Sequence, residues 1–583
     1  MAMEDARHLA WGYVQYPPMT AFLGRVALEL FGTSLVGFRF FAAVVQALAL
    51  VLTGLMAKEL GGGQWAQVVA ALAGVPFCLG AGALMQYISF DYVCWVWVAY
   101  CMVRALGCRR EVPEEVEKQQ SEPTLASPET QEAGRNSAAG KTGEGEPNST
   151  ARNDRATSKD QGSKDTSLGG RGDARWWVGV GAGIGLGMLA KYTMGFLVVG
   201  VAAGVLFTNA RKYLKSGWLW GGIVVAVGIC LPNLFWQWQR NFISLEFLKF
   251  LHARDVAEGL TDWFLLGQLE LTLLAFPLAL MGIYFYLFAE EGKRYRVLGW
   301  MYAVPLVLFV FMRGRDYYLA PGYPMLYAAG CALIEKRWLE AREDKRAKKM
   351  GKSQSERGKD QKSGRAFGAS HTERVGQPQD QLRADEQGER CSAYGSKNPP
   401  LYSRRHRGIV VAIWAALILD VVVAGAVALP IAPVGSAWWR FASRVDSVFP
   451  EEIGWPELVE AVSQVRERLP AEERVRVGIL AGNYGEVGAL NLYGQRFGLP
   501  WAISGVNSSW ERGYGNPAPD VVIVVGYSRE FLGREFASCV VAGHPWNRFG
   551  VANEETMEDP DIFVCRGLRG DWEEFWGRAR RFA

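Results

Sequence analysis

Long apolar regions separated by polar stretches constrain the fold of this chain more than any other feature. Residues 38–108 and 176–335 are mostly apolar, whereas residues 109–174 and 337–407 are nearly all polar. The mean hydropathy of +0.02 averages these opposites, so it does not describe an ordinary globular protein. A helix that crosses a bilayer needs about 20 predominantly apolar residues. The apolar regions therefore predict a mainly α-helical, polytopic membrane protein.

We predict about ten transmembrane helices from the apolar runs. The two that flank Lys191 are short, and together they could form one broken hairpin. Asp420 falls inside the last helix, where a carboxylate is costly unless it faces protein. The predicted helices cover residues 38–57, 64–82, 90–107, 176–190, 193–209, 217–235, 263–288, 297–312, 320–335 and 408–430.

Clusters of Lys and Arg predict the orientation of these helices. An even number of predicted helices, or one long loop, separates each cluster from the next, so all clusters share one face. The positive-inside rule makes that face cytoplasmic, and residues 431–583 then lie outside. The net charge of +4 disfavours a nucleic-acid partner held by global basicity. The clusters lie at residues 109–110 with 175, at 211–215, at 293–296, and at 336–337 with 404–407 across the second polar stretch.

The polar stretches divide the membrane part into segments. Residues 109–174 and 337–407 have compositions that cannot bury enough surface to fold, and they predict disordered cytoplasmic insertions. Residues 1–108 then form an N-terminal membrane part with the first external loop. Residues 175–336 form the membrane core, and residues 408–430 form the last transmembrane helix.

The last part of the chain, residues 431–583, predicts an extracytoplasmic α/β domain. Pro456–Leu469 has the apolar spacing of a helix, and two short β-branched runs, Val475–Leu480 and Val521–Val525, come after it in the chain. This alternation is typical of an α/β fold. The glycine-rich segment 482–488 resembles a phosphate-binding turn, but its spacing is G-x-x-G-x-x-G. A tight turn from strand to helix is therefore the favoured interpretation.

Two cysteines fall in this domain, Cys539 and Cys565. They belong to no CxxC pair, so a zinc site is disfavoured. Two separate buried thiols are the favoured interpretation, and a disulfide is the alternative if the compartment is oxidising.

Basic residues at the outer ends of helices run against the positive-inside trend. Several stand beside aromatic residues, and a guanidinium with Tyr donors nearby suits a lipid phosphate. Any single one could instead be a side chain reaching the interface, but the set favours a phosphate-bearing ligand. Asp91 opens a helix after a short external turn. It either caps that helix or orients a substrate hydroxyl or a cation.

Several short segments form an ordered set along the chain. They are His8–Pro18, Phe31–Arg39, Ala57–Gly61, Ser89–Asp91, Leu189–Thr193, Leu231–Trp236, Tyr317–Pro324, Glu452–Pro456 and Gly482–Gly485. This set resembles the bacterial polyprenyl-phosphate-dependent glycosyltransferases related to protein O-mannosyltransferases and lipid A aminoarabinose transferases. That family is glycosyltransferase family 39, with the GT-C fold, and the resemblance covers most of the chain outside the polar stretches.

The resemblance implies an integral-membrane glycosyltransferase at the outer face of the bacterial cytoplasmic membrane. Such an enzyme moves a sugar from a polyprenyl-phosphate donor to a lipid, glycan or protein acceptor, with inversion at the anomeric carbon. A carboxylate acts as general base on the acceptor hydroxyl, and cationic groups stabilise the departing lipid phosphate. No metal ligand is assigned and no cofactor is fixed, although a divalent metal is left open.

The resemblance also implies roles for particular residues. Asp91 is expected to position the acceptor or a cation. The donor phosphate is expected to contact Lys191, Arg313, Arg315, Tyr317 and Tyr318. The external substrate loops are expected to contain His8, Tyr13, His252 and Arg254.

One departure from the family concerns the principal base. The family has an Asp-Glu motif at the end of its first membrane helix, roughly ten residues before the segment that begins here at His8. We therefore expect that helix and motif upstream of Met1, and we do not transfer the role to Glu4 or Asp5. The alternatives are a non-catalytic membrane scaffold and a transporter or flippase of lipid-linked glycans. The chain shows no pair of repeated half-sequences that would favour a transporter.

Overall fold

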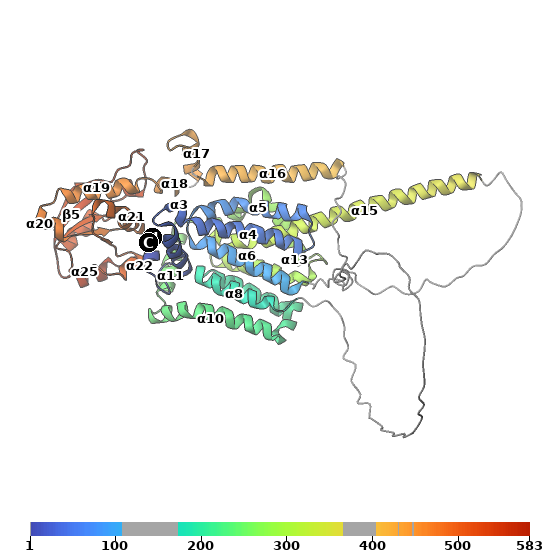
Figure 1. The fold of residues 1–583 in the computed structure, drawn as a ribbon, viewed down its shortest axis with the longest axis horizontal. Helices are drawn as coiled ribbons and strands as arrows, with labels where there is room; N and C mark the ends of the chain where they lie inside the picture. Colours follow the sequence, from blue (N-terminus) through green and yellow to red (C-terminus); the bar gives the residue numbers. More distant parts are fainter. Residues whose placement is uncertain (1, 108–172, 365–403, 430, 446–447, 583) are drawn as a thin grey trace, which may run out of the picture.

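The computed structural model describes residues 2–107, 173–364, 404–429, 431–445 and 448–582. It consists of a long helical bundle with an α/β domain at one end (Figure 1). This arrangement confirms the predicted fold class. The insertion predicted over residues 109–174 lies almost wholly outside the described residues, as does the part of the second insertion from 365 to 403.

The bundle is built from apolar helices, and every predicted membrane segment overlaps one of them. In the described part of the chain, six helices are long and apolar enough to cross a membrane, or seven if a pair bent by 98° counts as one span. The bundle helices are α2 (Met19–Phe31), α3 (Leu35–Phe38), α4 (Phe40–Glu59), α5 (Gln64–Ala83), α6 (Tyr87–Leu106), α8 (Trp176–Ala190), α9 (Met194–Phe207), α10 (Gly217–Gln239), α11 (Ile243–Ala257), α12 (Phe264–Thr272), α13 (Phe276–Leu287), α14 (Arg296–Phe311), α15 (Tyr323–Gly364) and α16 (Arg404–Ala428).

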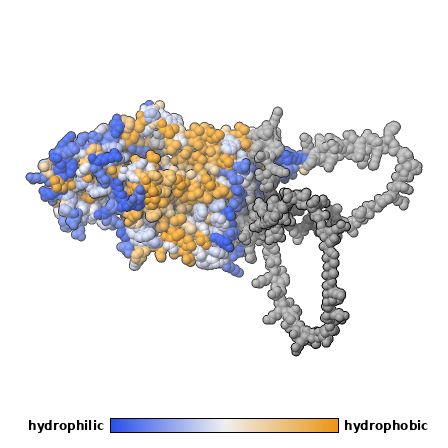
Figure 2. Space-filling model, viewed as in Figure 1, coloured by the Kyte–Doolittle hydropathy of each residue, from blue (hydrophilic) through white to orange (hydrophobic). Residues whose placement is uncertain are grey.

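Figure 2 shows apolar side chains over the middle of the bundle on the visible face, with hydrophilic residues toward both ends, and many bundle helices carry exposed apolar side chains that form an apolar belt. Many large apolar side chains of the bundle are exposed, and Phe311, at 81%, and Val224, at 70%, are examples. Water-soluble proteins seldom expose apolar surface on this scale. Asp420 on α16 is only 2% exposed, as expected if it faces protein. The belt therefore marks the surface that faces lipid.

Several of the basic clusters that were predicted to share one face lie at the end of the bundle away from the α/β domain. Glu291 forms ion pairs with Lys336 and Arg337, at 3.5 and 3.0 Å. The Tyr213 hydroxyl donates to the carbonyl of Ala105 at 3.1 Å. Helix α15 continues from this end to Gly364, so the first part of the predicted insertion 337–407 is helical. Ion pairs one turn apart, such as Lys336 with Glu340, support such a polar helix.

The α/β domain has a five-stranded sheet in the order β2-β1-β3-β5-β4. Strand β1 is parallel to β2 and β3, whereas β5 is antiparallel to β3 and β4. The strands are β1 (Val477–Ala481), β2 (Ala502–Ile503), β3 (Val521–Val525), β4 (Phe536–Gly543) and β5 (Ile562–Leu568).

Helices cover both faces of this sheet, each with its own apolar core. Helices α19 (Trp455–Glu467) and α21 (Tyr484–Tyr493) cover one face, and α23 (Arg529–Glu535) and α25 (Trp572–Ala579) cover the other. The remaining helices are α1 (Ala2–Arg7), α17 (Ala437–Val445), α18 (Val448–Glu451), α20 (Ala471–Arg476), α22 (Asn507–Trp510) and α24 (Glu554–Met557).

Two local predictions for this domain have different outcomes. The glycine-rich segment is a strand-to-helix turn, as favoured, because Asn483 and Glu486 form a capping box at the start of α21. The favoured prediction of two separate thiols is wrong, since Cys539 and Cys565 form a disulfide. These residues lie opposite each other on β4 and β5, a register that the sequence did not reveal.

Candidate active site

Three breaks between helices meet at the end of the bundle that carries the α/β domain. The first two turns of α6, directly after the α5–α6 turn, supply Tyr87 and Asp91, and the break between α8 and α9 supplies Lys191. The 3-10 helix η4 (Asp316–Gly322), between α14 and α15, supplies Tyr317 and Tyr318. Helix breaks at this depth expose polar groups and leave room for side chains to converge.

Lys191 points into a group of aromatic rings. Its Nζ lies 4.2 Å from the ring centre of Tyr318, 4.7 Å from that of Tyr317 and 5.4 Å from that of Tyr87. Contacts of this kind stabilise a desolvated ammonium group. The charged groups that act on Lys191 are Asp91 and Arg315. We call Lys191 and the three tyrosines the lysine cage.

Arg315 stands beside the lysine cage and is held rigidly. Its Nε and Nη2 donate to the two carboxylate oxygens of Asp255 at 2.9 and 2.8 Å. These hydrogen bonds, with the charge of Asp255, raise the pKa of Arg315 above its ordinary value. Asp255 is only 3% exposed, so the bidentate pair fixes the direction of the guanidinium.

Asp91 lies one helical turn after Tyr87 and is 3% exposed. Its Oδ2 accepts from the Thr193 hydroxyl at 3.4 Å, and its Oδ1 has no hydrogen-bond partner. A buried carboxylate oxygen without a partner is costly, so such a group often belongs to a site that binds something.

The structure brings some of the predicted site residues together and keeps others apart. Asp91, Lys191, Arg315, Tyr317 and Tyr318 converge, and Arg254 pairs with Asp255 at 3.4 Å next to Arg315.

Four other predicted residues lie elsewhere. Arg313 is exposed and pairs with Asp262 at 3.3 Å. His252 is exposed on α11, and His8 is half-exposed beside Glu4 at 3.4 Å. Tyr13 is buried, and its hydroxyl donates to the carbonyls of Asp5 and His8. Tyr13 therefore holds this N-terminal loop in place, and burial raises its pKa to about 12.

The sequence reasoning missed Tyr87 as a member of the lysine cage. Its spacing of four residues from Asp91 places both on one face of a helix, and this was the available signal. Asp255 is the second residue of this region that the sequence did not assign to the site. Its partner Arg315 is 60 residues away, and sequence spacing does not reveal such a pair.

The α/β domain and the N-terminal segment reach this region. Tyr87 packs on Tyr16 at 5.9 Å between ring centres, and the Tyr16 hydroxyl donates to Asp5. Asp5 in turn forms an ion pair with Arg512 of the α/β domain. Tyr484, at the start of α21, is close enough to Tyr87 and Arg254 to act on both electrostatically. The domain thus borders the site instead of standing apart from it.

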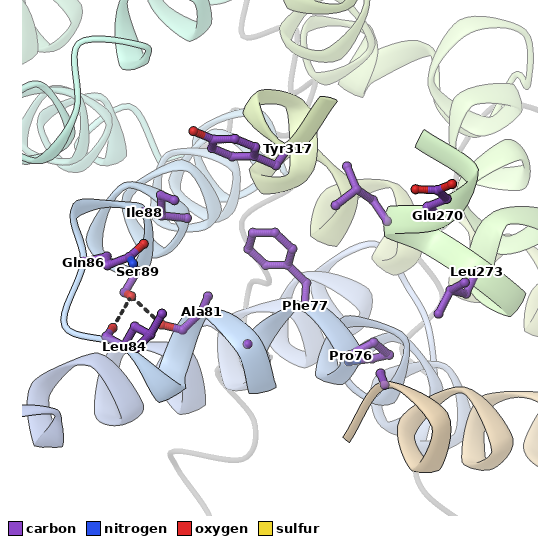
Figure 3. A pocket seen from close by; sticks show the side chains of 13 residues that line it. Pro76, Phe77, Ala81, Leu84, Gln86, Ile88, Ser89, Glu270, Leu273 and Tyr317 are labelled. Atoms are coloured by element: carbon purple, nitrogen blue, oxygen red, sulfur yellow. Dashed lines mark hydrogen bonds between the residues drawn. The ribbon is translucent and has the colours of Figure 1, made fainter. Parts of the chain in front are cut away.

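A cavity of about 340 Å³ opens beside Tyr317. Figure 3 shows its wall, in which Phe77 lies between the α5–α6 turn and α12. Ala424 of α16 completes one side. Most of the lining is apolar, and Gln86, Ser89 and Glu270 are the polar side chains of the wall.

These features define the class of the protein, which is a polytopic membrane protein with a cationic, aromatic site at one end of its bundle. The family model described as dolichyl-phosphate-mannose-protein mannosyltransferase matches residues 15–112 and 169–236. This match agrees with the resemblance drawn from the sequence, over those two stretches of the chain. Both matched stretches contribute to the lysine cage, through Tyr87 and Lys191.

Comparisons with other proteins add the following. No curated protein matches the chain. The crystal structure of ArnT from Cupriavidus metallidurans bound to undecaprenyl phosphate is 14% identical, with a TM-score of 0.45, over 97% of this chain and 92% of that one. The archaeal oligosaccharyltransferase AglB from Archaeoglobus fulgidus, in complex with an inhibitory peptide and a dolichol-phosphate, is 12% identical. Its TM-score is 0.40, over 88% of this chain and 61% of that one.

Proposed function

We propose that this chain is an integral-membrane glycosyltransferase that takes a sugar from a polyprenyl phosphate and transfers it to an acceptor hydroxyl. The observation that carries the proposal is the lysine cage beside the rigid Arg315. This arrangement offers two cations to one phosphate and lies next to an apolar cavity. The family match supports the same chemistry.

Two cations suit a lipid phosphate because the leaving group gains negative charge as the bond to the sugar breaks. Lys191 is held by rings and not by a carboxylate within ion-pair distance in the described chain, so it can meet a phosphate without first losing a partner. Arg315 is already oriented by Asp255, which lowers the entropy cost of binding. Tyr317 and Tyr318 remain neutral donors, because burial raises their pKa values.

The cavity beside Tyr317 supports a lipid donor. Its apolar wall suits the first isoprene units next to the phosphate, and its volume of about 340 Å³ has the size of a small-ligand site. The apolar belt around the bundle would accommodate the rest of the chain within the bilayer.

The acceptor side is assigned more coarsely. Asp91 has one free, buried carboxylate oxygen, and it would position the acceptor hydroxyl or a cation. A general base would take the hydroxyl proton while the oxygen attacks the anomeric carbon opposite the phosphate, so the configuration inverts. The acceptor is a lipid, a glycan or a protein.

The same proposal places the reaction at the outer face of a bacterial cytoplasmic membrane. Residues 431–583 would be extracytoplasmic, and the disulfide between Cys539 and Cys565 suits an oxidising compartment. The basic end of the bundle, with Lys336 and Arg337, would face the cytoplasm. The stretches 109–174 and 337–407 would then be cytoplasmic insertions.

The test is release of polyprenyl phosphate from a radiolabelled polyprenyl-phosphate sugar by the purified full-length protein. Replacing Arg315 with Ala, or Lys191 with Met, should lower donor use at least tenfold. That value corresponds to the loss of one charge-assisted contact of about 1.5–3 kcal/mol. The matched control is Arg529→Ala, which removes an exposed arginine that pairs with Asp561 on the α/β domain.

Three results would overturn the proposal. Unchanged donor use in both site variants would remove the phosphate assignment. Movement of the labelled lipid across a vesicle membrane without release of polyprenyl phosphate would instead indicate a flippase. A chain that neither binds nor cleaves the donor would be a scaffold.

A further inference from the structure

Three glutamates that are not part of the lysine cage converge where the α/β domain meets the bundle. Glu451 ends α18, and Glu554 and Glu555 form the first turn of α24. One carboxylate oxygen from each lies within 4.8 Å of the other two. We call them the glutamate triad.

The triad contains a buried oxygen with no partner. Glu555 is 8% exposed, and its Oε2 accepts no hydrogen bond. Glu451 is fixed in place because its Oε2 accepts the backbone N–H of Glu554 at 3.0 Å, across 103 residues of sequence. This hydrogen bond fixes where the Glu451 carboxylate lies relative to α24.

The charges of the triad are not balanced by nearby cations. Among the described residues, none of the three glutamates forms an ion pair within 4.0 Å with Lys, Arg or His. Glu451, Glu486 and Glu554 are all close enough to Glu555 to act on it electrostatically. Like charges in a partly buried place are costly unless a cation or protons neutralise them.

We propose that the glutamate triad binds a divalent cation of the hard, oxygen-preferring class, with Ca²⁺ the best fit. Three carboxylates and no His or Cys form a donor set suited to Ca²⁺ or Mg²⁺ and not to Zn²⁺. Mg²⁺ demands a near-ideal octahedron, whereas Ca²⁺ accepts irregular sets of carboxylates and water. Glu554 is exposed, so water can complete the coordination.

The cation would join two short helices that are far apart in the sequence. It would tie the end of α18, which leads in from the membrane part, to α24 inside the α/β domain. Tyr484 is close enough to act electrostatically on all three glutamates and on Arg254 of α11. A cation here would therefore stabilise the domain in its place beside the outer loops. This inference goes beyond the glycosyl transfer proposed above and does not depend on it.

The experiment uses terbium, which binds at Ca²⁺ sites and emits when a nearby Trp is excited. The indole of Trp455 donates to the backbone carbonyl of Glu451 at 2.8 Å, so a sensitising ring adjoins the triad. The purified full chain is stripped with EDTA and titrated with Tb³⁺, followed by Ca²⁺ or Mg²⁺ as competitor. We expect saturable emission that Ca²⁺ displaces at a concentration at least tenfold lower than Mg²⁺.

The double variant Glu451→Gln with Glu554→Gln should weaken Tb³⁺ binding at least tenfold. The matched control is Glu467→Gln, an exposed carboxylate on the same helix as Trp455, which should leave the titration unchanged. A second measurement needs no variant. Added Ca²⁺ should raise the unfolding temperature of the stripped wild-type chain in a concentration-dependent way.

Three outcomes would overturn the proposal. They are emission that does not saturate, equal Tb³⁺ affinity in the double variant, and an unfolding temperature that Ca²⁺ leaves unchanged. Displacement by Mg²⁺ as readily as by Ca²⁺ would overturn the assignment of the ion.

Discussion

At the scale of single residues, the site contrasts two ways of holding a cation. Lys191 sits among tyrosine rings, which stabilise its charge without neutralising it. Arg315 is paired with Asp255, which fixes its direction but offsets its charge. An incoming phosphate would therefore find one available cation and one oriented cation. This difference argues that Lys191 supplies most of the attraction and Arg315 most of the geometry.

Glu486 gives a prediction about pH at this scale. It is 3% exposed and accepts the backbone N–H groups of Gly482 and Asn483. Burial outweighs these hydrogen bonds and raises its pKa to about 7. A raised folded-state pKa gives stability that is full below the unfolded value and is lost as pH rises through the folded value. The contribution is on the order of 3 kcal/mol.

The measurement compares thermal unfolding of the wild-type chain with that of Glu486→Gln, in EDTA, between pH 5 and pH 8. The wild type should lose stability relative to the variant as pH rises, because Gln keeps the acceptor oxygen but carries no charge. A difference between the two proteins that stays constant with pH would contradict the assignment.

The sequence predicts those residues of the site that stand in local motifs, but not those whose position depends on distant contacts or on local backbone geometry. Lys191, Tyr317 and Tyr318 stand beside recognisable motifs at helix ends, so their place outside the helices could be inferred. Arg313, two residues before Arg315, has the same local pattern, yet it turns outward to Asp262. Arg313 also has a positive φ of 50°, and the sequence around it carries no signal for this backbone turn.

At the scale of elements, the bundle depends on close approach between helices. A Cβ added to Gly181 on α8 would lie 1.9 Å from the carbonyl oxygen of Gly222 on α10. Small residues at such crossings are typical of membrane helices, because packing replaces the hydrophobic effect there. Helix α8 ends at Lys191, so its packing against α10 also positions the lysine cage.

Replacing Gly181 with Ala should therefore destabilise the bundle, since the obstacle is backbone and not a movable side chain. We expect a loss of about 1–3 kcal/mol, the range for overpacking. It would appear as a lower unfolding temperature in detergent. Gly228→Ala on α10 is the matched control, because nothing lies within 4 Å of the added Cβ. Equal melting temperatures for the two variants would show that the contact between α8 and α10 accommodates the added methyl group without cost.

At the scale of the whole molecule, hydropathy predicted the positions of the membrane helices and of the α/β domain, because both follow from patterns within one segment. It did not predict how the N-terminal segment meets that domain. Arg512 pairs with the buried Asp5, and Ser508 accepts the backbone N–H of Val14 at 2.9 Å. These partners are about 500 residues apart in the chain, and no local pattern relates them.

The last prediction concerns this junction. Removing the Arg512 side chain leaves Asp5, which is 1% exposed, without its charged partner. Breaking a buried pair in this way costs about 3 kcal/mol, which speeds amide exchange roughly 100-fold where exchange follows the opening equilibrium. In Arg512→Ala, exchange at the Val14 amide should increase by that factor, because its acceptor Ser508 belongs to the same junction.

The control is Arg476→Ala, which breaks the exposed pair with Asp520 on the same domain and costs at most about 1 kcal/mol. Since both variants lose one arginine from one domain, a similar exchange rate in the two would mean that the Asp5 pair does not hold the domain to the bundle.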